Sequence, residues 1–350
     1  MKAMVLKAAN TPFVFEILPD PTPGPNEAVA RVLSCGSGLT IQHVKAGRSK
    51  ALFPRIIGHE ITGEIVETGS KVKDLKIGDP VTAYYYLYCS NCHWCQSNLE
   101  PLCENNGGNV GKDCDGGYAE LIKLPVQNFI KLPPGLEYKK FPAEIGVISD
   151  AVATPVKVLK RARVTAGETV AVFGAGGGIG IHMLMLARRA QTRVIAIDIA
   201  TNKFDACDKA GADEIVDASE AKVSEAILDL TKGKGVDVVI DFVSTALTLE
   251  TGMAILGRRG RLITLGGHGQ KFTADASTML LKEQELLGSR YVTRREVVDA
   301  LNLVANGDIW PMVTDIRPWE EAEKLHELLE KGDVTGRAAL LIGAQRPNLS

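Results

Sequence analysis

The sequence has almost no imbalance of charge, since 40 lysine and arginine residues stand against 42 aspartate and glutamate residues. A net charge of −2 offers no electrostatic reason to bind nucleic acid or an anionic membrane, so we expect a small-molecule partner. The first twenty residues also lack a continuous apolar stretch of signal-peptide length. We therefore expect a cytoplasmic protein, in which the seven cysteines serve as metal ligands more readily than as disulfides.

At 350 residues the chain is longer than one hydrophobic core usually supports, so we expect two domains. The first part has the short apolar runs and turn residues of a small all-β unit. A helical pattern follows from Leu136 to Ala162, with Asp150 inside an apolar stretch. A buried carboxylate is costly unless it pairs with a cation or binds a metal, and both possibilities stay open. The expected strands are Met4–Leu6, Phe13–Ile17, Ala28–Leu33, Ile61–Thr68 and Val81–Leu87.

A glycine-rich turn between two apolar segments organises the second part. Residues 169–173 are typical of a buried strand, a helix should follow the turn, and the next strand ends on Asp198. In a dinucleotide-binding βαβ unit the glycines admit a pyrophosphate, the helix N-terminus attracts it, and the acid binds the adenosine ribose. Asp198 favours NAD, because its carboxylate would repel the 2′-phosphate of NADP. The predicted cofactor-binding residues are Gly174, Gly176, Gly177, Gly178, Ile179, Gly180, Asp198 and Lys203.

The same segment raises a second possibility, because residues 169–187 carry no charge if His182 is neutral and could be taken for a membrane span. The five glycines in its first half argue against that interpretation. Further strands at 214–217, 236–241, 261–265 and 285–289, joined by helical crossovers, complete a six-stranded, doubly wound parallel sheet of the α/β class. We expect this dinucleotide-binding domain to span residues 151–290.

Four cysteines lie in one loop with the spacing C-x₂-C-x₂-C-x₇-C: Cys89, Cys92, Cys95 and Cys103. Four thiolates so close together match a closed, tetrahedral zinc site in which every ligand is protein. The alternatives are a disulfide pair, which a reducing compartment disfavours, and an iron–sulfur cluster, whose last spacing is shorter. We expect this zinc to stabilise the loop and to take no part in chemistry.

Together these features resemble the zinc-containing, medium-chain alcohol dehydrogenases over nearly the whole chain. The resemblance implies a chaperonin-like β-barrel catalytic domain formed by residues 1–150 and 291–350, beside the Rossmann domain. It also implies a homo-oligomer, a tetramer rather than a dimer. The motifs that carry it are Cys35-Gly36, Gly58-His59-Glu60, the cysteine loop, Asp115 to Glu120, the glycine turn, Asp198 and Gly336-Arg337.

By position, Cys35, His59 and Asp150 resemble the three protein ligands of the family's catalytic zinc, which makes two zinc ions per chain. Such a ligand set leaves a fourth position for water or alcohol. Glu60 resembles the glutamate that lies behind that metal, and Arg337 the arginine that pairs with the cofactor pyrophosphate. The resemblance therefore predicts hydride transfer between an alcohol and NAD, giving an aldehyde or ketone.

Thr40 and His43 match the family's proton relay, which runs from the alcohol through the threonine and the nicotinamide ribose to the histidine. Leu39 and Tyr85 are the predicted substrate-pocket residues. The chain departs from the family at Gly38 and Leu39, which replace polar residues or cysteine in many members. It departs again at Ile41, which stands where an acid usually orients the histidine ligand.

Two other functions stay open at this stage. One is a zinc-free, NADPH-dependent reductase of activated double bonds, which would lack the set formed by Cys35, His59 and Asp150. The other is a non-catalytic, NAD-binding structural protein that keeps the fold without the open metal site. Metal analysis separates the second from the enzyme, because it would hold one zinc ion per chain instead of two. The sequence does not identify the alcohol.

Overall fold

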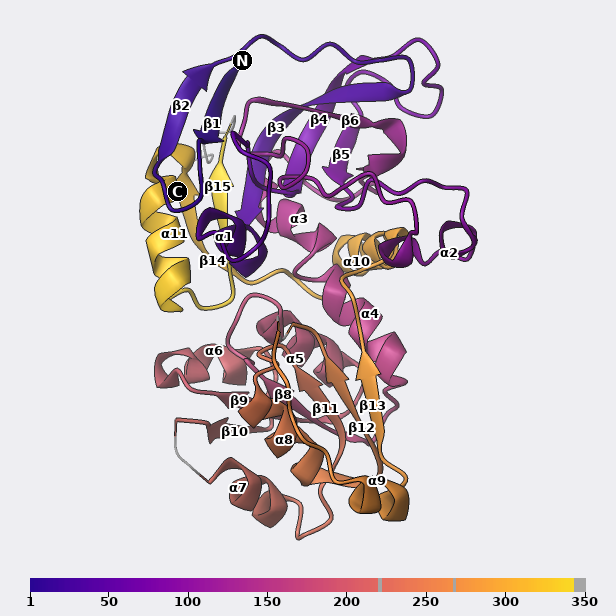
Figure 1. The fold of residues 1–350 in the computed structure, drawn as a ribbon, viewed down its shortest axis with the longest axis vertical. Coiled ribbons are helices and arrows are strands. Elements are labelled where there is room, and N and C mark those ends of the chain that lie inside the picture. Colours follow the sequence, from indigo (N-terminus) through magenta and orange to yellow (C-terminus); the bar gives the residue numbers. More distant parts are fainter. Residues whose placement is uncertain (220–221, 267–268, 343–350) are drawn as a thin grey trace. The chain divides into compact units, whose positions relative to one another are not determined.

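The computed structural model describes residues 1–219, 222–266 and 269–342. The chain divides into two compact units (Figure 1): the first is formed by Met1–Ala153 and Val292–Ser350, the second by Thr154–Tyr291. Among the described residues, no helix has both the length and the apolar character that a membrane crossing requires.

The first unit is built on β-structure. A two-stranded antiparallel sheet joins β1 (Lys2–Leu6) to β2 (Phe13–Ile17). The larger sheet has the strand order β14-β15-β3-β4-β5-β7, with β6 paired to β3. Its strands are β3 (Glu27–Ser37), β4 (Glu60–Thr68), β5 (Pro80–Ala83), β6 (Leu121–Pro125), β7 (Phe129–Lys131), β14 (Val313–Pro318) and β15 (Arg337–Leu341). Apolar side chains from both sheets form one buried core.

Helices of the first unit are short before the Rossmann sheet and longer after it. The tail, from Val292 onward, belongs to this unit and supplies two strands, β14 and β15, to its larger sheet. The α-helices are α1 (Leu39–Lys45), α2 (His93–Gln96), α3 (Pro142–Gly146), α10 (Arg294–Ala305) and α11 (Ala322–Lys331); the 3₁₀ helices are η1 (Glu100–Leu102), η2 (Val126–Asn128), η3 (Val147–Ser149) and η5 (Trp319–Glu321).

The second unit is a parallel sheet flanked by helices (Figure 1), with the strand order β10-β9-β8-β11-β12-β13. The order reverses at β8, so a crevice is expected at the carboxyl ends of β8 and β11. This confirms the doubly wound sheet. Its strands are β8 (Thr169–Phe173), β9 (Arg193–Asp198), β10 (Glu214–Asp217), β11 (Val236–Asp241), β12 (Leu256–Thr264) and β13 (Glu285–Gly288). Its helices are α4 (Ala153–Ala162), α5 (Gly180–Arg189), η4 (Thr201–Lys203), α6 (Phe204–Lys209), α7 (Val223–Leu230), α8 (Ala246–Ile255) and α9 (Ala276–Lys282).

Strand β3 is longer than the sequence predicts, and the difference concerns the site. We expected the strand to end at Leu33, because Cys-Gly-Ser is weak strand-forming sequence. It runs to Ser37, because Cys35 pairs with Ile61 on β4 and with Leu340 on β15. Partners distant in the sequence thus supply the hydrogen bonds that local propensity does not favour.

The predicted helix over 136–162 is interrupted. It divides into α3, η3 and α4, and Asp150 follows η3 with φ −128° and ψ −65°, outside the helical region. Because of this break, the backbone of Asp150 is not helical, and its side chain does not follow the direction that a continuous helix would impose. The strand predicted to reach Leu87 ends at Ala83, and β14 was not predicted.

Candidate functional site

The glycine turn of the second unit leads directly from β8 into α5. Gly174 adopts φ +72°, which favours glycine, and a Cβ at Gly180 would lie 2.1 Å from the carbonyl oxygen of Gly174. His182 Nδ1 donates to the Gly178 carbonyl at 2.7 Å and so joins α5 to the turn that precedes it. The backbone can therefore turn tightly only because these positions carry no side chain.

Asp198 is joined to the same turn. It ends β9, is 8% exposed, and its Oδ2 accepts a hydrogen bond from Gly176 N at 2.8 Å. Its Oδ1 accepts from Ala200 N at 3.0 Å. Lys203 is buried, and a Cβ at Gly176 would lie 2.6 Å from its side chain. The acid, the lysine and the turn thus form one site, with carboxylate lone pairs left for further donors.

The four loop cysteines gather as predicted. Their sulfurs all lie within 4.8 Å of one another. The Cys92–Cys95, Cys89–Cys95 and Cys92–Cys103 sulfurs are 3.5, 3.9 and 4.0 Å apart. Zn–S bonds of about 2.3 Å place tetrahedral sulfurs about 3.8 Å apart, so these separations fit four thiolates around one zinc ion. They are far too long for a disulfide, and all seven cysteines are free.

Backbone N–H groups stabilise the thiolate form of two of these cysteines, which is the form that binds metal. Asn91 N and Cys92 N donate to Cys89 Sγ, both at 3.4 Å, and lower the pKa of the Cys89 thiol to about 6. A hydrogen bond from the Cys95 backbone lowers the pKa of Cys92 in the same way. Burial instead raises the pKa of Cys95 to about 12, so this thiol needs the metal's own charge to ionise.

The second cluster belongs to the first unit, and its side chains are almost completely buried. Cys35 is on β3, His59 and Glu60 stand where β4 begins, and Asp150 follows η3. Arg337 opens β15, the strand that pairs with the end of β3. The cluster therefore needs three antiparallel neighbours and the helix break at Asp150.

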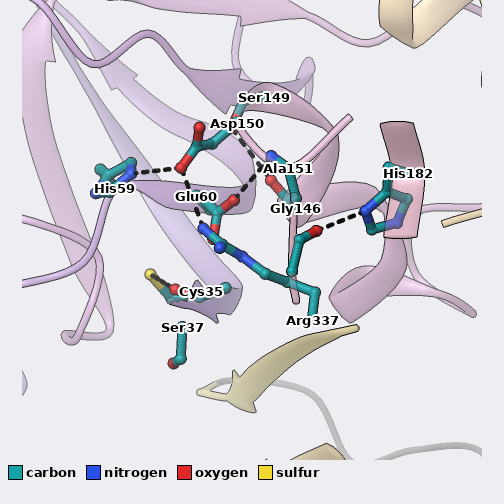
Figure 2. Close-up of polar contacts among 12 residues, drawn as sticks. Cys35, Ser37, His59, Glu60, Gly146, Ser149, Asp150, Ala151, His182 and Arg337 are labelled. Carbon is teal, nitrogen blue, oxygen red and sulfur yellow. Dashed lines mark hydrogen bonds and ion pairs between the residues drawn. The ribbon is translucent and has the colours of Figure 1, made fainter. Parts of the chain in front are cut away.

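Figure 2 shows the guanidinium of Arg337 between two carboxylates. Its Nη2 lies 2.7 Å from Glu60 Oε2 and 3.1 Å from Asp150 Oδ2. The same Asp150 oxygen lies 3.4 Å from His59 Nε2. Glu60 Oε1 also accepts from Ala151 N at 3.2 Å. Both possibilities raised for Asp150 meet here, because it pairs with a cation and faces the predicted histidine ligand.

Electrostatics in this cluster favour a further positive charge. Burial, with the nearby Glu60 carboxylate, raises the pKa of the Cys35 thiol well above its usual range. Burial also raises the pKa of Glu60, against the opposing effect of Arg337. When the carboxyl groups of Glu60 and Asp150 are both ionised, the single positive charge of Arg337 leaves the buried cluster with a net charge of about −1. A divalent cation held by thiolate, imidazole and carboxylate would supply the further positive charge, and these donors suit zinc.

Cys35 completes the donor set chemically, and its sulfur lies beside two glycines. Cβ atoms built at Gly58 and Gly117 would lie 2.6 and 3.0 Å from Cys35 Sγ. Across the part of the chain that the structure describes, the loop cysteines are the only such group of three or more that stands within metal reach. The donor atoms of His59 and Asp150 lie 3.4 Å apart, whereas the Cys35 sulfur does not lie within 4.8 Å of both of them.

The other predicted residues are Tyr85, which contacts this cluster, and three residues of α1. Tyr85 is buried, and its ring packs against that of His59 at a tilt of 54°, with 4.7 Å between the centroids. Leu39 and Thr40 open α1, and Leu39 is 54% exposed. His43 lies near the end of α1, where its Nδ1 accepts from Arg48 Nε at 2.9 Å.

The structure gives a steric reason for glycine at position 38 that the sequence did not indicate. A Cβ there would lie 2.1 Å from Arg337 Nη1 and 2.3 Å from its Cζ. The guanidinium of Arg337 therefore packs directly on the backbone at Gly38. The pyrophosphate contact assigned to Arg337 by resemblance stays a prediction.

The sequence analysis did not identify a set of buried polar residues that begins two positions after Cys35: Ser37, Tyr118 and His326. Ser37 is on the same face of β3 and is fully buried, as expected two residues along a strand. Its hydroxyl lies 2.6 Å from that of Tyr118, which lies 2.9 Å from His326 Nε2. Strand alternation could have indicated Ser37, but nothing local connects it to Tyr118 or His326.

Comparisons with known proteins agree with this architecture. Residues 24–134 match the family model of the alcohol dehydrogenase GroES-like domain, and residues 178–306 match that of zinc-binding dehydrogenases. The NAD-dependent alcohol dehydrogenase of Sulfolobus acidocaldarius is 28% identical, over 98% of this chain and 100% of the relative. The acryloyl-coenzyme A reductase of Metallosphaera sedula is 30% identical, over 97% and 99%.

Among solved structures, the alcohol dehydrogenase of the hyperthermophilic archaeon Aeropyrum pernix superimposes with a TM-score of 0.90 at 30% identity. That match covers 98% of this chain and all of the other. The two domain matches, the near-complete coverage and the observed sheets lead to one conclusion. The chain belongs to the zinc-type medium-chain dehydrogenase/reductase family of oxidoreductases.

Proposed function

We propose that the protein is an NAD-dependent alcohol dehydrogenase that interconverts an alcohol with its aldehyde or ketone. The observation that carries the proposal is the buried convergence of His59 Nε2 and Asp150 Oδ2, 3.4 Å apart, beside the strand that bears Cys35. Relatives described as NAD-dependent alcohol dehydrogenases support it.

Cys35, His59 and Asp150 would hold the catalytic zinc, and Cys89, Cys92, Cys95 and Cys103 the structural one. When bound, the first ion supplies a Lewis acid that makes an alcohol hydroxyl more acidic. The tilted Tyr85 ring packs against the His59 ring and limits its movement, and Glu60 shares Arg337 with Asp150. The first unit thus orients the donors and excludes water from them.

Asp198 and the glycine turn support NAD as the cofactor. The Asp198 carboxylate is held against the turn by Gly176 N, where a ribose 2′-phosphate would meet its negative charge. NAD itself accepts the hydride, and the protein contributes binding and orientation. The packing of Lys203 against Gly176 in the turn supports its proposed role as a contact of the bound dinucleotide.

The test follows formation of reduced nicotinamide by absorbance. The purified protein is offered primary, secondary, cyclic and aromatic alcohols, first with NAD and then with NADP. We expect turnover with NAD, at least tenfold more efficient than with NADP. If no alcohol gave reduced nicotinamide, the result would contradict the proposal. The metal content is measured as well, and we expect two zinc ions per chain.

A second candidate is a zinc-free reductase of activated double bonds. It is favoured by the 30% identity to the acryloyl-coenzyme A reductase and by the pairing of Asp150 with Arg337 instead of an arrangement of three converged ligands. Consumption of NADPH with enals, enones or an enoyl thioester, by protein holding one zinc ion per chain, would select it. The same metal content with no turnover at all would select the non-catalytic interpretation.

Assembly and location complete the proposal. By resemblance we propose a homotetramer in preference to a dimer, with a small alcohol or carbonyl compound as the partner. A cytoplasmic location stays a prediction from the sequence. Light scattering on the purified protein measures the mass of the assembly directly.

A further inference from the structure

Strand β2 is the outer strand of the small sheet in the first unit (Figure 1). Its neighbour β1 has partners on both sides, because Leu6 N donates to Arg55 O at 2.8 Å and Arg55 N donates to Leu6 O at 2.9 Å on the side away from β2. Within the described parts of the chain, β2 itself pairs with β1 alone. One edge of β2 therefore faces away from its own sheet.

The backbone groups of β2 alternate between its two edges, as in any antiparallel strand. Phe13 N donates to the Glu323 carboxylate of α11 and not to β1, so the odd-numbered positions direct their backbone groups outward. Among the described residues, the N–H groups of Phe15 and Ile17 have no hydrogen-bond acceptor. The outward edge of β2 thus offers donors and acceptors that another strand can use.

The side chains of β2 do not protect this edge. The strand reads Phe-Val-Phe-Glu-Ile and contains no lysine, arginine or proline, the residues that commonly keep an outer strand from pairing with another chain. The outer strands of the larger sheet do contain them, since β7 has a lysine and β14 an arginine and a proline. On β2, Val14 is 42% exposed on one face, while Phe15 and Ile17 are 37% and 81% exposed on the other. Apolar surface is therefore exposed on both faces of the strand.

The charges around β2 are balanced within the chain. Glu16, the one ionisable residue of the strand, forms an ion pair with Lys7. Near the start of the strand Glu323 lies 2.9 Å from Lys45, and beyond its end Asp20 lies 2.5 Å from the N-terminal amine. A second copy of this edge can therefore approach without bringing unpaired charges of like sign together.

The sequence of β2 is complementary to itself in the antiparallel direction. A two-fold axis at Phe15 places the outward N–H and C=O groups of the two Phe15 residues opposite each other, as a hydrogen-bonded pair. Ile17 N of each copy then faces the Phe13 carbonyl of the other. Along this face every cross-strand pair is apolar, which is the arrangement that stabilises a sheet.

We propose that β2 is a self-association strand, which pairs antiparallel with β2 of a second copy of this chain and joins the two small sheets into one. The contact is isologous, because both copies use the same residues. It supplies one interface of the proposed homotetramer and goes beyond the proposed activity. No predicted metal ligand or cofactor-binding residue takes part, so assembly and turnover are tested separately.

The first experiment measures the mass of the assembly by light scattering. Ile17→Lys puts a charge opposite the partner's Phe13, whereas in a single copy the same side chain lies in water. We expect the mass to fall to half the wild-type value, with the circular dichroism spectrum, zinc content and turnover unchanged. Ile77→Lys, at a 72% exposed turn position of the same unit, is the matched control and should keep the wild-type mass.

The proposal is wrong if Ile17→Lys keeps the wild-type mass. A monomeric wild-type protein also overturns it, in favour of a strand supplied by a different protein. If the wild-type protein assembles as proposed but oxidises no alcohol, the proposed function alone fails.

The second experiment tests the register. In the proposed pair the two Phe15 Cα atoms lie about 5.5 Å apart, so Phe15→Cys should give a disulfide-linked dimer on mild oxidation, seen by non-reducing electrophoresis. Ile17→Cys is the control, because its two copies lie about 14 Å apart along the strands, beyond the reach of a disulfide. The wild-type protein gives the background from its seven cysteines. No linked dimer from Phe15→Cys, or an equal yield from Ile17→Cys, overturns the proposed pairing.

Discussion

Asp150 serves two partners at once, because its Oδ2 contacts both His59 Nε2 and Arg337 Nη2. Asp150→Asn keeps the shape of the side chain and removes the charge that both a zinc ion and Arg337 need. We expect zinc content to fall from two ions to one per chain and turnover to fall more than about 100-fold, since even indirect partners of a metal contribute 10- to 100-fold. Metal analysis and steady-state kinetics are the measurements. Wild-type turnover in this variant would remove Asp150 from the ligand set.

Gly38 is the second residue on which the buried cluster depends. A methyl group at this position meets the guanidinium of Arg337, 2.1 Å from Nη1, so Gly38→Ala must displace the cation from Glu60 and Asp150. Overpacking of this kind costs about 1–3 kcal/mol, and we expect a loss of that size in the free energy of unfolding. Urea denaturation measures it.

The control for Gly38→Ala is Gly288→Ala. A Cβ at Gly288 meets nothing within 4 Å, and its φ is not positive. It should leave the free energy of unfolding within about 0.5 kcal/mol of wild type. Equal losses in the two variants would contradict the steric account of Gly38.

At the scale of elements, the cysteine loop owes its structure to its ligands more than to its one-turn helix α2. Cys95→Ser removes the most buried of the four sulfurs. We expect loss of one zinc ion, rapid proteolytic cleavage between residues 89 and 103, and a lower Tm, because structural zinc contributes folding energy directly. Cys114→Ser, outside the cluster, should retain both the metal and the resistance to protease. Full zinc content in Cys95→Ser would exclude it as a ligand.

Local pattern predicted the elements of the second unit closely and those of the first less well. Residues 169–173, 214–217 and 236–241 are strands with the bounds that their apolar, β-branched composition indicates. Buried parallel strands are continuous apolar runs, so composition alone delimits them. The end of β3 instead depends on pairing with β4 and β15, which come later in the sequence.

At the scale of the whole molecule, acid should destabilise the fold through His326. Its pKa is about 3 in the folded state, against an ordinary value of 6.5, because the ring is buried with Lys45 nearby. The unfolded chain therefore binds more protons between these pH values, and the free energy of unfolding decreases as the pH falls from about 6.5 toward 3. Glu330, with its pKa lowered to about 2, adds a loss of the same sign below pH 4.5.

His326→Gln isolates this contribution. The variant is less stable at neutral pH, because Tyr118 and Gln42 lose a buried partner, but its free energy of unfolding should fall less steeply between pH 6.5 and 4.5. Urea unfolding followed by circular dichroism at a series of pH values measures both slopes. Parallel curves for wild type and His326→Gln would show that the buried imidazole does not control the acid response.

By itself the sequence determined the family, the two-domain organisation, the glycine turn with Asp198, and the cysteine quartet. All of these are encoded in short spacings or in apolar runs, so neighbouring residues are enough to specify them. It also named Cys35, His59 and Asp150, whose joint ligand role stays a prediction.

Only the tertiary structure decided which side chains meet. It placed Arg337 between Glu60 and Asp150, packed it on Gly38, and joined Ser37 to Glu330 through Tyr118, His326 and Gln42. The two partners that are farthest apart along the chain, Gly38 and Arg337, are separated by 299 positions. Hydrogen-bond direction and charge compensation depend on distances of about 3 Å, which no local pattern encodes.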